Sequence, residues 1–247
     1  MNATFYLTFG SDTTIQQLDV PLPDIKEIHT KLVSHRAGVY AAFDAFVHVW
    51  ETQYKSKLSL SAALVQLRPD FLTNKFLPSL TVDKRNVFPA AEIKKSFYAV
   101  WTLGTELDLL SDELVRNNLL WAFFLDIAAT KILIHFHQKL IKMLNAELCQ
   151  TQEIVAGEYY PGCGETEMEL VTHIIDAIVQ TGLPLIDTKQ GLPQPKKTQC
   201  ALLFCGSASA KLNFPKIPCG ICLAKQCTYY QLGACHMGSN WQETKES

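Results

Sequence analysis

The sequence predicts an α+β body followed by a small cysteine-rich module, and three observations support this fold class. The chain has 247 residues, 48% of them hydrophobic and 19% charged, so it can bury a sizeable core. Segments with strand character are separated by segments with helical periodicity. Several of the eight cysteines follow one another closely near the carboxyl end. We expect the α+β body over residues 1–206 and a metal or iron–sulfur module with a polar tail over 207–247.

The first part of the body predicts one strand and one long helix. Residues 4–9 form a β-rich apolar run that ends in a polar turn, and Val39–Trp50 has the pattern of a buried helix. Asp44 and His48 lie four residues apart on one face of that helix, a spacing that favours a solvated pair over a functional site. Residues 51–90 are broken up by prolines and predict short helices and loops.

The second part of the body carries stronger signals. Ser96–Leu103 predicts a buried strand that is bounded by a glycine. Helices are expected over residues 106–117 and 119–144, and a third helix should run from a capping box at Thr166 and Glu169 to a stop at Gly182. Short strands are expected over 184–187 and 200–206. An apolar stripe predicts the buried face of the long helix: Phe123, Ile127, Ile134 and Ile141. His135 and His137 are two residues apart, so they point to different faces and make poor joint metal ligands.

Composition argues against two classes of partner. The 22 Lys and Arg balance 24 Asp and Glu, whereas nucleic-acid binding needs clustered cationic side chains. The longest apolar stretch, Leu119–Phe136, is interrupted by Asp126 and Lys131 and therefore predicts a buried helix, not a membrane span. The amino terminus has neither a basic n-region nor an apolar h-region, so we expect a cytoplasmic protein with reduced thiols.

The cysteine module has the spacing C-x2-C-x4-C-x7-C. Its members are Cys219, Cys222, Cys227 and Cys235. Four thiolates so close together suit an iron–sulfur cluster, a 4Fe–4S cluster included, or a tetrahedral zinc, and the spacing does not decide between them. The fourth ligand could instead be Cys163, Cys205 or His236. A thiol oxidoreductase site is the third interpretation, although the C-x-x-C does not open a helix after a strand.

The remaining cysteines predict structural roles. Cys149 falls near a helix end and is expected to be a small buried hydrophobic residue. Cys200 and Cys205 lie on one strand at an odd separation, so their side chains should face opposite sides of a sheet.

Four stretches in this order resemble one known family over about residues 95–206. They are VWTLGTELD (100–108), AFFLDIAA (122–129), YPGCGE (160–165) and GLPQPKKT (191–198). Together they resemble the reactivation domain of vitamin B12-dependent methionine synthase, which binds S-adenosylmethionine. The resemblance implies a mixed or antiparallel central sheet with flanking helices.

The resemblance also implies a cofactor-binding loop. Its residues are Glu158, Tyr160, Gly162 and Cys163. Glu158 and Cys163 stand where the family has arginine and tyrosine. An arginine can hold the methionine carboxylate bidentately, whereas Glu158 would repel it.

The function implied by the resemblance is that of a corrinoid-related redox or reactivation protein. Such domains dock over cobalamin in a corrinoid protein or methyltransferase and restore oxidised cobalt by adding an electron and a methyl group. An iron–sulfur cluster in the cysteine module would relay the electron, because these clusters reach low potentials. The alternative is a non-catalytic binding or adaptor module with a structural zinc.

Overall fold

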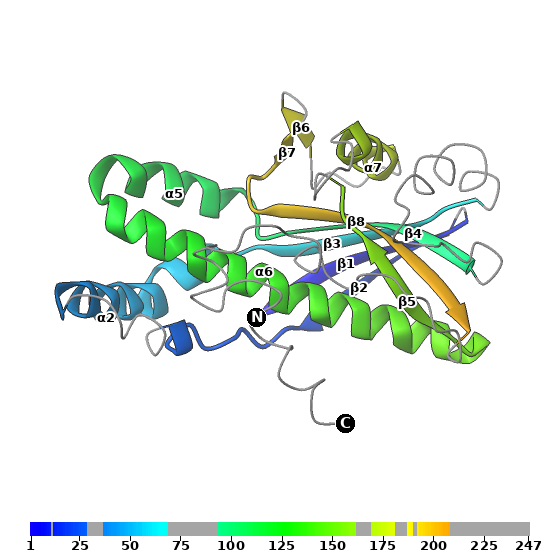
Figure 1. Cartoon of the computed structure of the whole chain (residues 1–247), viewed down its shortest axis with the longest axis horizontal. Coiled ribbons are helices and arrows are strands. Elements are labelled where there is room, and N and C mark those ends of the chain that lie inside the picture. Colours follow the sequence, from blue (N-terminus) through cyan, green and yellow to red (C-terminus); the bar gives the residue numbers. More distant parts are fainter. Residues whose placement is uncertain are drawn as a thin grey trace, which may run out of the picture.

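Six strands form the central sheet, and their order in space differs from their order in the chain. The computed structural model describes residues 1–10, 12–28, 37–68, 93–161, 169–180, 187–189 and 192–207. The strands are β1 (Asn2–Phe9), β2 (Asp12–Asp19), β3 (Leu60–Gln66), β4 (Ile93–Thr102), β5 (Glu153–Tyr159) and β8 (Thr198–Ser207). Across the sheet they run β2-β1-β3-β4-β8-β5 (Figure 1). A separate two-stranded ribbon pairs β6 (Asp187–Lys189) with β7 (Leu192–Gln194).

The sheet is mixed, which confirms the expected α+β class. β1 and β3 are parallel, and every other neighbouring pair in the sheet is antiparallel. A parallel pair needs a long crossover connection, and the helix α2 (Ala37–Thr52) lies within it.

Helices cover both faces of this sheet. The other helices are α5 (Thr105–Asn117), α6 (Leu119–Leu148) and α7 (Glu169–Val179), and short 3-10 turns occupy Tyr54–Lys57 and Cys149–Thr151. α6 crosses one face, with α2 and α5 beside it, and α7 covers the other face (Figure 1). The sequence of β4 explains this double cover, because its side chains are apolar on both sides. Phe97 and Trp101 join the core under α6, whereas Tyr98 and Val100 join the core under α7.

The helix α6 spans 30 residues, or about 45 Å, and organises the larger core. It is capped by Asn118, whose side-chain oxygen accepts a hydrogen bond from the Trp121 amide at 3.1 Å. The helix is long and apolar enough to cross a membrane, but 56% of its most apolar window is buried inside the protein. This burial is that of a core helix in a soluble protein.

One member of the predicted apolar stripe on α6 is exposed. Ile127 and Ile134 are in the core and Ile141 is partly buried against it, but Phe123 is 41% exposed. The first turns of α6 run beyond the ends of the strands together with α5 (Figure 1). Phe123 therefore lies on a part of the helix that has no sheet beneath it, and the prediction that it faces the core is wrong.

Three strands of the central sheet were not expected from the sequence. β2 is exposed along nearly its whole length, so it has no alternation of apolar and polar residues. β3 falls inside residues 51–90, where short helices and loops were predicted, and it is buried between β1 and β4. β5 includes Glu158, which was placed in a loop.

The described cysteines follow the predictions in part. Cys200 packs in the core under α7 and Cys205 in the core under α6, as their odd separation predicted. Cys149 is exposed, so the expectation that it is buried is wrong. The helix α6 continues to Leu148, four residues beyond the predicted end. Cys149 therefore lies just after the last buried residue of the helix.

Candidate functional site

Three of the four family-like stretches, 100–108, 122–129 and 191–198, meet at one end of the sheet. The ammonium of Lys197, just before β8, lies 2.5 Å from the carboxylate of Asp126 on α6. It also donates to the hydroxyl of Thr130 at 3.2 Å. These contacts tie the turn that precedes β8 to the first half of α6.

The same turn contacts the start of α5. The Lys196 amide donates to the Asp108 carboxylate at 2.6 Å, and the Lys196 ammonium pairs with Asp112. Burial raises the pKa of the Asp108 carboxyl, against the lowering effect of the hydrogen bond and charge of Lys196. Stretches that lie about ninety residues apart in the chain are thus direct neighbours here.

The strand ends are joined in the same way. The Leu103 amide donates to the Lys197 carbonyl at 3.1 Å. The hydroxyl of Thr198 at the start of β8 donates to that of Thr102 at the end of β4, at 2.8 Å. The backbone paths of these two strands are therefore fixed where the turn leaves β4 for α5.

Gly104 in this turn has a physical reason to be glycine. Its φ is +91°, a conformation that residues with a side chain rarely adopt. A Cβ atom at this position would lie 2.8 Å from the Cβ of Ser59. The T-L-G sequence at the end of β4 thus marks a close approach of two backbone segments.

A buried polar cluster lies beneath the end of β5. The Tyr160 hydroxyl donates to Glu158 Oε2 at 2.5 Å, and His137 Nε2 on α6 lies 2.8 Å from the same oxygen. The Tyr160 hydroxyl and His137 Nε2 are 3.2 Å apart. The side chains of His137 and Glu158 are only 7% and 13% exposed. We call His137, Glu158 and Tyr160 the buried triad.

The buried triad is packed against Trp101 of β4. The rings of Trp101 and His137 are stacked with their centroids 4.6 Å apart, and Trp101 is fully buried. One carboxylate oxygen can accept both hydrogen bonds, so Glu158 is satisfied inside the protein. Its carboxylate is directed at α6, which differs from the ligand-facing role that the resemblance implied for this position.

Sequence reasoning found two members of this triad and missed the third. Glu158 and Tyr160 were expected to bind a cofactor, and the structure brings them together. The spacing of His135 and His137 argues only against a shared metal, but His137 falls on the buried stripe of α6 with Leu133, Leu140 and Leu144. A histidine on a buried stripe needs a polar partner, so its position on the stripe was the signal that could have indicated this contact. His135 lies outside the triad, and burial, followed by the charge of Lys139, lowers its pKa.

A shallow apolar groove runs between α5 and α6. It has a volume of about 750 Å³ and is lined by Ser111, Val115, Leu119, Leu120, Ala122, Phe123 and Asp126. Several of these side chains are large, apolar and exposed, Leu119 to 72% and Val115 to 54%. We call this feature the α5–α6 groove. Asp126 places its inner end next to the Lys197 ion pair.

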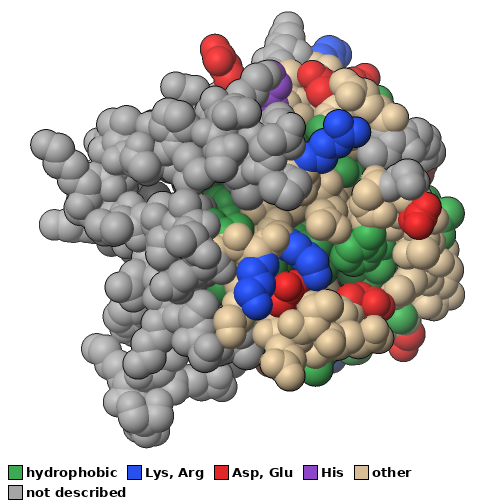
Figure 2. Space-filling model, turned by 90° about the vertical axis from the view of Figure 1, so that its right-hand side faces the viewer, with side chains coloured by type: hydrophobic (Ala, Val, Ile, Leu, Met, Phe, Trp, Pro, Cys, Tyr) green, Lys and Arg blue, Asp and Glu red, His purple; other side chains and the backbone are tan. Residues whose placement is uncertain are grey.

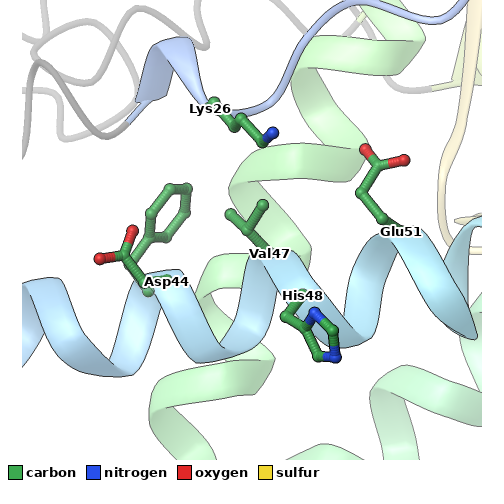
Figure 3. Close-up of a pocket in the computed structure, with 6 residues that line it drawn as sticks. Lys26, Asp44, Val47, His48 and Glu51 are labelled. Atoms are coloured by element: carbon green, nitrogen blue, oxygen red, sulfur yellow. The ribbon is translucent and has the colours of Figure 1, made fainter.

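A second hollow, of about 490 Å³, lies where Lys26 approaches α2. Figure 3 shows Asp44 and Glu51 on the side of the helix that faces Lys26, whereas His48 is directed away from them. Asp44 and His48 are both exposed, in keeping with the predicted solvated pair. Within the described parts of the chain, no group of three His, Cys, Asp or Glu side chains is arranged to hold a metal.

The opposite end of the sheet, which faces the viewer in Figure 2, also carries charged side chains. Basic and acidic side chains lie side by side there. β4 and β5 both begin here, and Lys95 Nζ lies 2.7 Å from Glu153 Oε2. Burial tends to raise the pKa of Glu153, but hydrogen bonds from Lys95 and Thr151 and the charge of Lys95 outweigh it, so the pKa is lowered.

The other predicted site residues lie outside the described residues. They are Gly162, Cys163, Cys219, Cys222, Cys227 and Cys235. No protein-family model matches the sequence, and no curated protein matches it. The likeness to the methionine synthase reactivation domain therefore rests on the quoted residues alone.

Proposed function

We propose that the protein is a corrinoid-related redox or reactivation protein of the cytoplasm that acts on a cobalamin-dependent methyltransferase. One observation carries the proposal: three of the four stretches quoted for the resemblance, 100–108, 122–129 and 191–198, are joined by contacts such as Lys197–Asp126 and Lys196–Asp108 at one end of the sheet. The order of these stretches along the chain is thus accompanied by contact in space, which supports a common structural role.

The position of Glu158 removes one objection to the binding of S-adenosylmethionine. A glutamate that faced the ligand would repel its carboxylate, but Glu158 is bound to His137 and Tyr160 and is mostly buried. Backbone groups of the following loop would then have to hold the ligand, because the family arginine is missing. A cluster at Cys219, Cys222 and Cys227 would relay one electron from a low-potential reductant and convert Co(II) to Co(I). S-adenosylmethionine would then transfer its methyl group to Co(I) and leave as S-adenosylhomocysteine.

Metal analysis of protein purified without oxygen tests the redox assignment. We expect about four iron and four sulfide per chain and a brown colour. Cys219→Ala should lose the iron and the colour, whereas Cys149→Ala, which removes an exposed cysteine at the end of α6, should keep both. A Cys219→Ala protein with full iron and an unchanged absorption spectrum would rule out the cluster.

Titration with S-adenosylmethionine tests the ligand separately. We expect calorimetry to detect saturable binding to the full chain. Glu158→Gln should keep that binding, because the carboxylate is directed at α6 and away from the ligand. A large gain in affinity in Glu158→Gln would show instead that Glu158 faces and repels the ligand.

The alternative is a binding or adaptor module with a structural zinc, and one observation favours it. The buried triad is nearly closed to solvent, so its side chains are poorly placed to react with a substrate. This alternative predicts one zinc per chain, no visible chromophore and unfolding on chelation.

A further inference from the structure

We propose that the edge strand β2 pairs with β2 of a second copy of the chain, so that two central sheets join into one. This inference does not depend on the proposed function. β2 is the outermost strand of the described sheet, and seven of its eight residues are exposed. An edge strand presents a row of backbone N–H and C=O groups to which another strand can add.

The two edges of the sheet differ in how they are protected. At β5 the register with β8 shifts between Val155 and Gly157, and the carboxylate of Glu153 is buried at the start of the strand. Bulges and inward-pointing charges of this kind discourage strand addition. β2 keeps an unbroken register with β1 and contains no proline, glycine or lysine, and its acidic residues, Asp12 and Asp19, stand at its ends. The middle of β2 therefore lacks the usual obstacles to pairing.

The hairpin geometry shows which backbone groups of β2 face the open edge. Only two residues separate the paired Phe9 and Asp12, so this pair must be a hydrogen-bonded one. Hydrogen-bonded and non-hydrogen-bonded pairs alternate along an antiparallel ladder. The N–H and C=O groups of Thr13, Ile15 and Gln17 therefore point away from β1, toward the edge.

Two-fold symmetry then selects a register. When two identical antiparallel strands extend one sheet, the axis passes between a residue and its own copy. Ile15, near the middle of β2, is the most exposed large apolar residue of the strand at 63%. With Ile15 on the axis, Thr13 lies opposite Gln17 of the copy, and Asp12 lies opposite Leu18. No carboxylate is then directly opposite another, which a sheet would penalise.

The side chains next to the edge fit this register. Ile15 lies opposite Tyr6 of β1, and Tyr6 packs against the core under α7. The joined sheet would align Ile15 and Tyr6 of one copy with the same two residues of the other in a single apolar row. Cross-strand pairs of β-branched and aromatic side chains stabilise a sheet. The row would cover apolar surface of Ile15 that a single chain leaves exposed.

The interface is small, so the dimer should be reversible. The pairing spans residues 12–18 of each copy, a shorter contact than the about 800 Å² per partner of a standard stable interface. We expect a dissociation constant of about 1–100 μM.

Analytical ultracentrifugation of the full chain at about 1–200 μM tests the pairing. We expect the mass to rise with concentration from 27.7 kDa toward twice that value. Ile15→Lys sets two ammonium groups against each other on the axis and should weaken association about tenfold or more. Gln17→Pro removes an outward N–H, which an edge strand tolerates, and should also weaken it. Leu109→Lys is the matched control, because Leu109 is also 63% exposed but lies on α5, and it should associate like the wild type.

Cysteine substitutions test the register itself. Paired residues of an antiparallel ladder have Cα atoms about 4.5–5.5 Å apart, which is within the range of a disulfide. Mild oxidation of Ile15→Cys should therefore link two copies through the introduced thiols, and peptide mapping by mass spectrometry would detect the link. In Leu18→Cys the introduced thiols would be about 20 Å apart, so no such link should form. The reverse pattern would refute the register.

Three results would overturn pairing through β2. The first is a wild type that stays monomeric over the whole concentration range, which would exclude a second copy at this edge. The second is a dimer that neither Ile15→Lys nor Gln17→Pro weakens. The third is a dimer that Leu119→Lys dissociates and Ile15→Lys does not, which would assign the association to the α5–α6 groove. Unchanged far-ultraviolet circular dichroism shows that each variant is folded.

Discussion

Replacing the ionisable members of the buried triad provides a direct test of how this fold is held together. His137→Leu removes the histidine and leaves the Glu158 carboxylate, 13% exposed, with Tyr160 as its remaining partner in the triad. Breaking a buried pair from one side costs about 3–5 kcal/mol, and we expect about 3 kcal/mol because Tyr160 still donates to Glu158.

The single variant Glu158→Leu should lower the free energy of unfolding less than His137→Leu does. In Glu158→Leu, His137 and Tyr160 remain within hydrogen-bond distance of each other at 3.2 Å. We expect a loss of about 2 kcal/mol.

The double variant His137→Leu/Glu158→Leu shows whether the two residues act as a pair. It buries no charge and leaves only the Tyr160 hydroxyl without its partners in the triad, so it should also cost about 2 kcal/mol. The coupling energy between the two positions is then about 3 kcal/mol.

Urea unfolding followed by tryptophan fluorescence measures these losses, because Trp101 stacks on His137. His135→Leu is the matched control on the same helix, outside the triad, and should change the free energy of unfolding by less than about 1 kcal/mol. Additive effects in the double variant, to within about 0.5 kcal/mol, would refute the coupling of His137 and Glu158.

Three further predictions concern other parts of the protein. Gly104→Ala should lower the free energy of unfolding by about 2–4 kcal/mol in urea titration, because its positive φ and close contact both oppose a side chain. Burial, with the Glu153 charge as a second cause, raises the pKa of Cys205 to about 12, so mass mapping after thiol alkylation at pH 8 should find Cys149 modified and Cys205 unmodified until the protein unfolds. The lowered pKa of Glu153 contributes stability that is present above its unfolded value and lost as pH falls through the folded value. Lys95→Met should therefore flatten the acid limb of a stability-versus-pH curve, and an unchanged limb would contradict the assignment.

The strongly apolar elements were predictable from the sequence, and the weakly patterned ones were not. β4 and α6 carry long apolar runs whose burial is imposed by composition. β2 is exposed on both sides and so shows no period. β3 contains small residues and follows no turn signal, and only its place between two other strands makes it a strand.

The candidate site shows the same division. Glu158 and Tyr160 are two residues apart, so the sequence could place them together. The partnership with His137 depends on how α6 crosses the sheet, and no local pattern encodes that crossing. Phe123 was expected in the core because periodicity shows which face of a helix is apolar, but not where the helix runs past the sheet.

The position of β8 has a consequence for how the chain folds. It is the last described strand in the sequence, yet it lies between β4 and β5. Until residues 198–207 have been made, both neighbours carry open hydrogen-bonding edges in what becomes the interior of the sheet. If synthesis stopped before residue 198, the edges of β4 and β5 that pair with β8 would stay unpaired, and the chain would have a strong tendency to aggregate. Completion of the sheet is thus deferred to the end of the body, and the part between β4 and the edge strand β5 is the last to close.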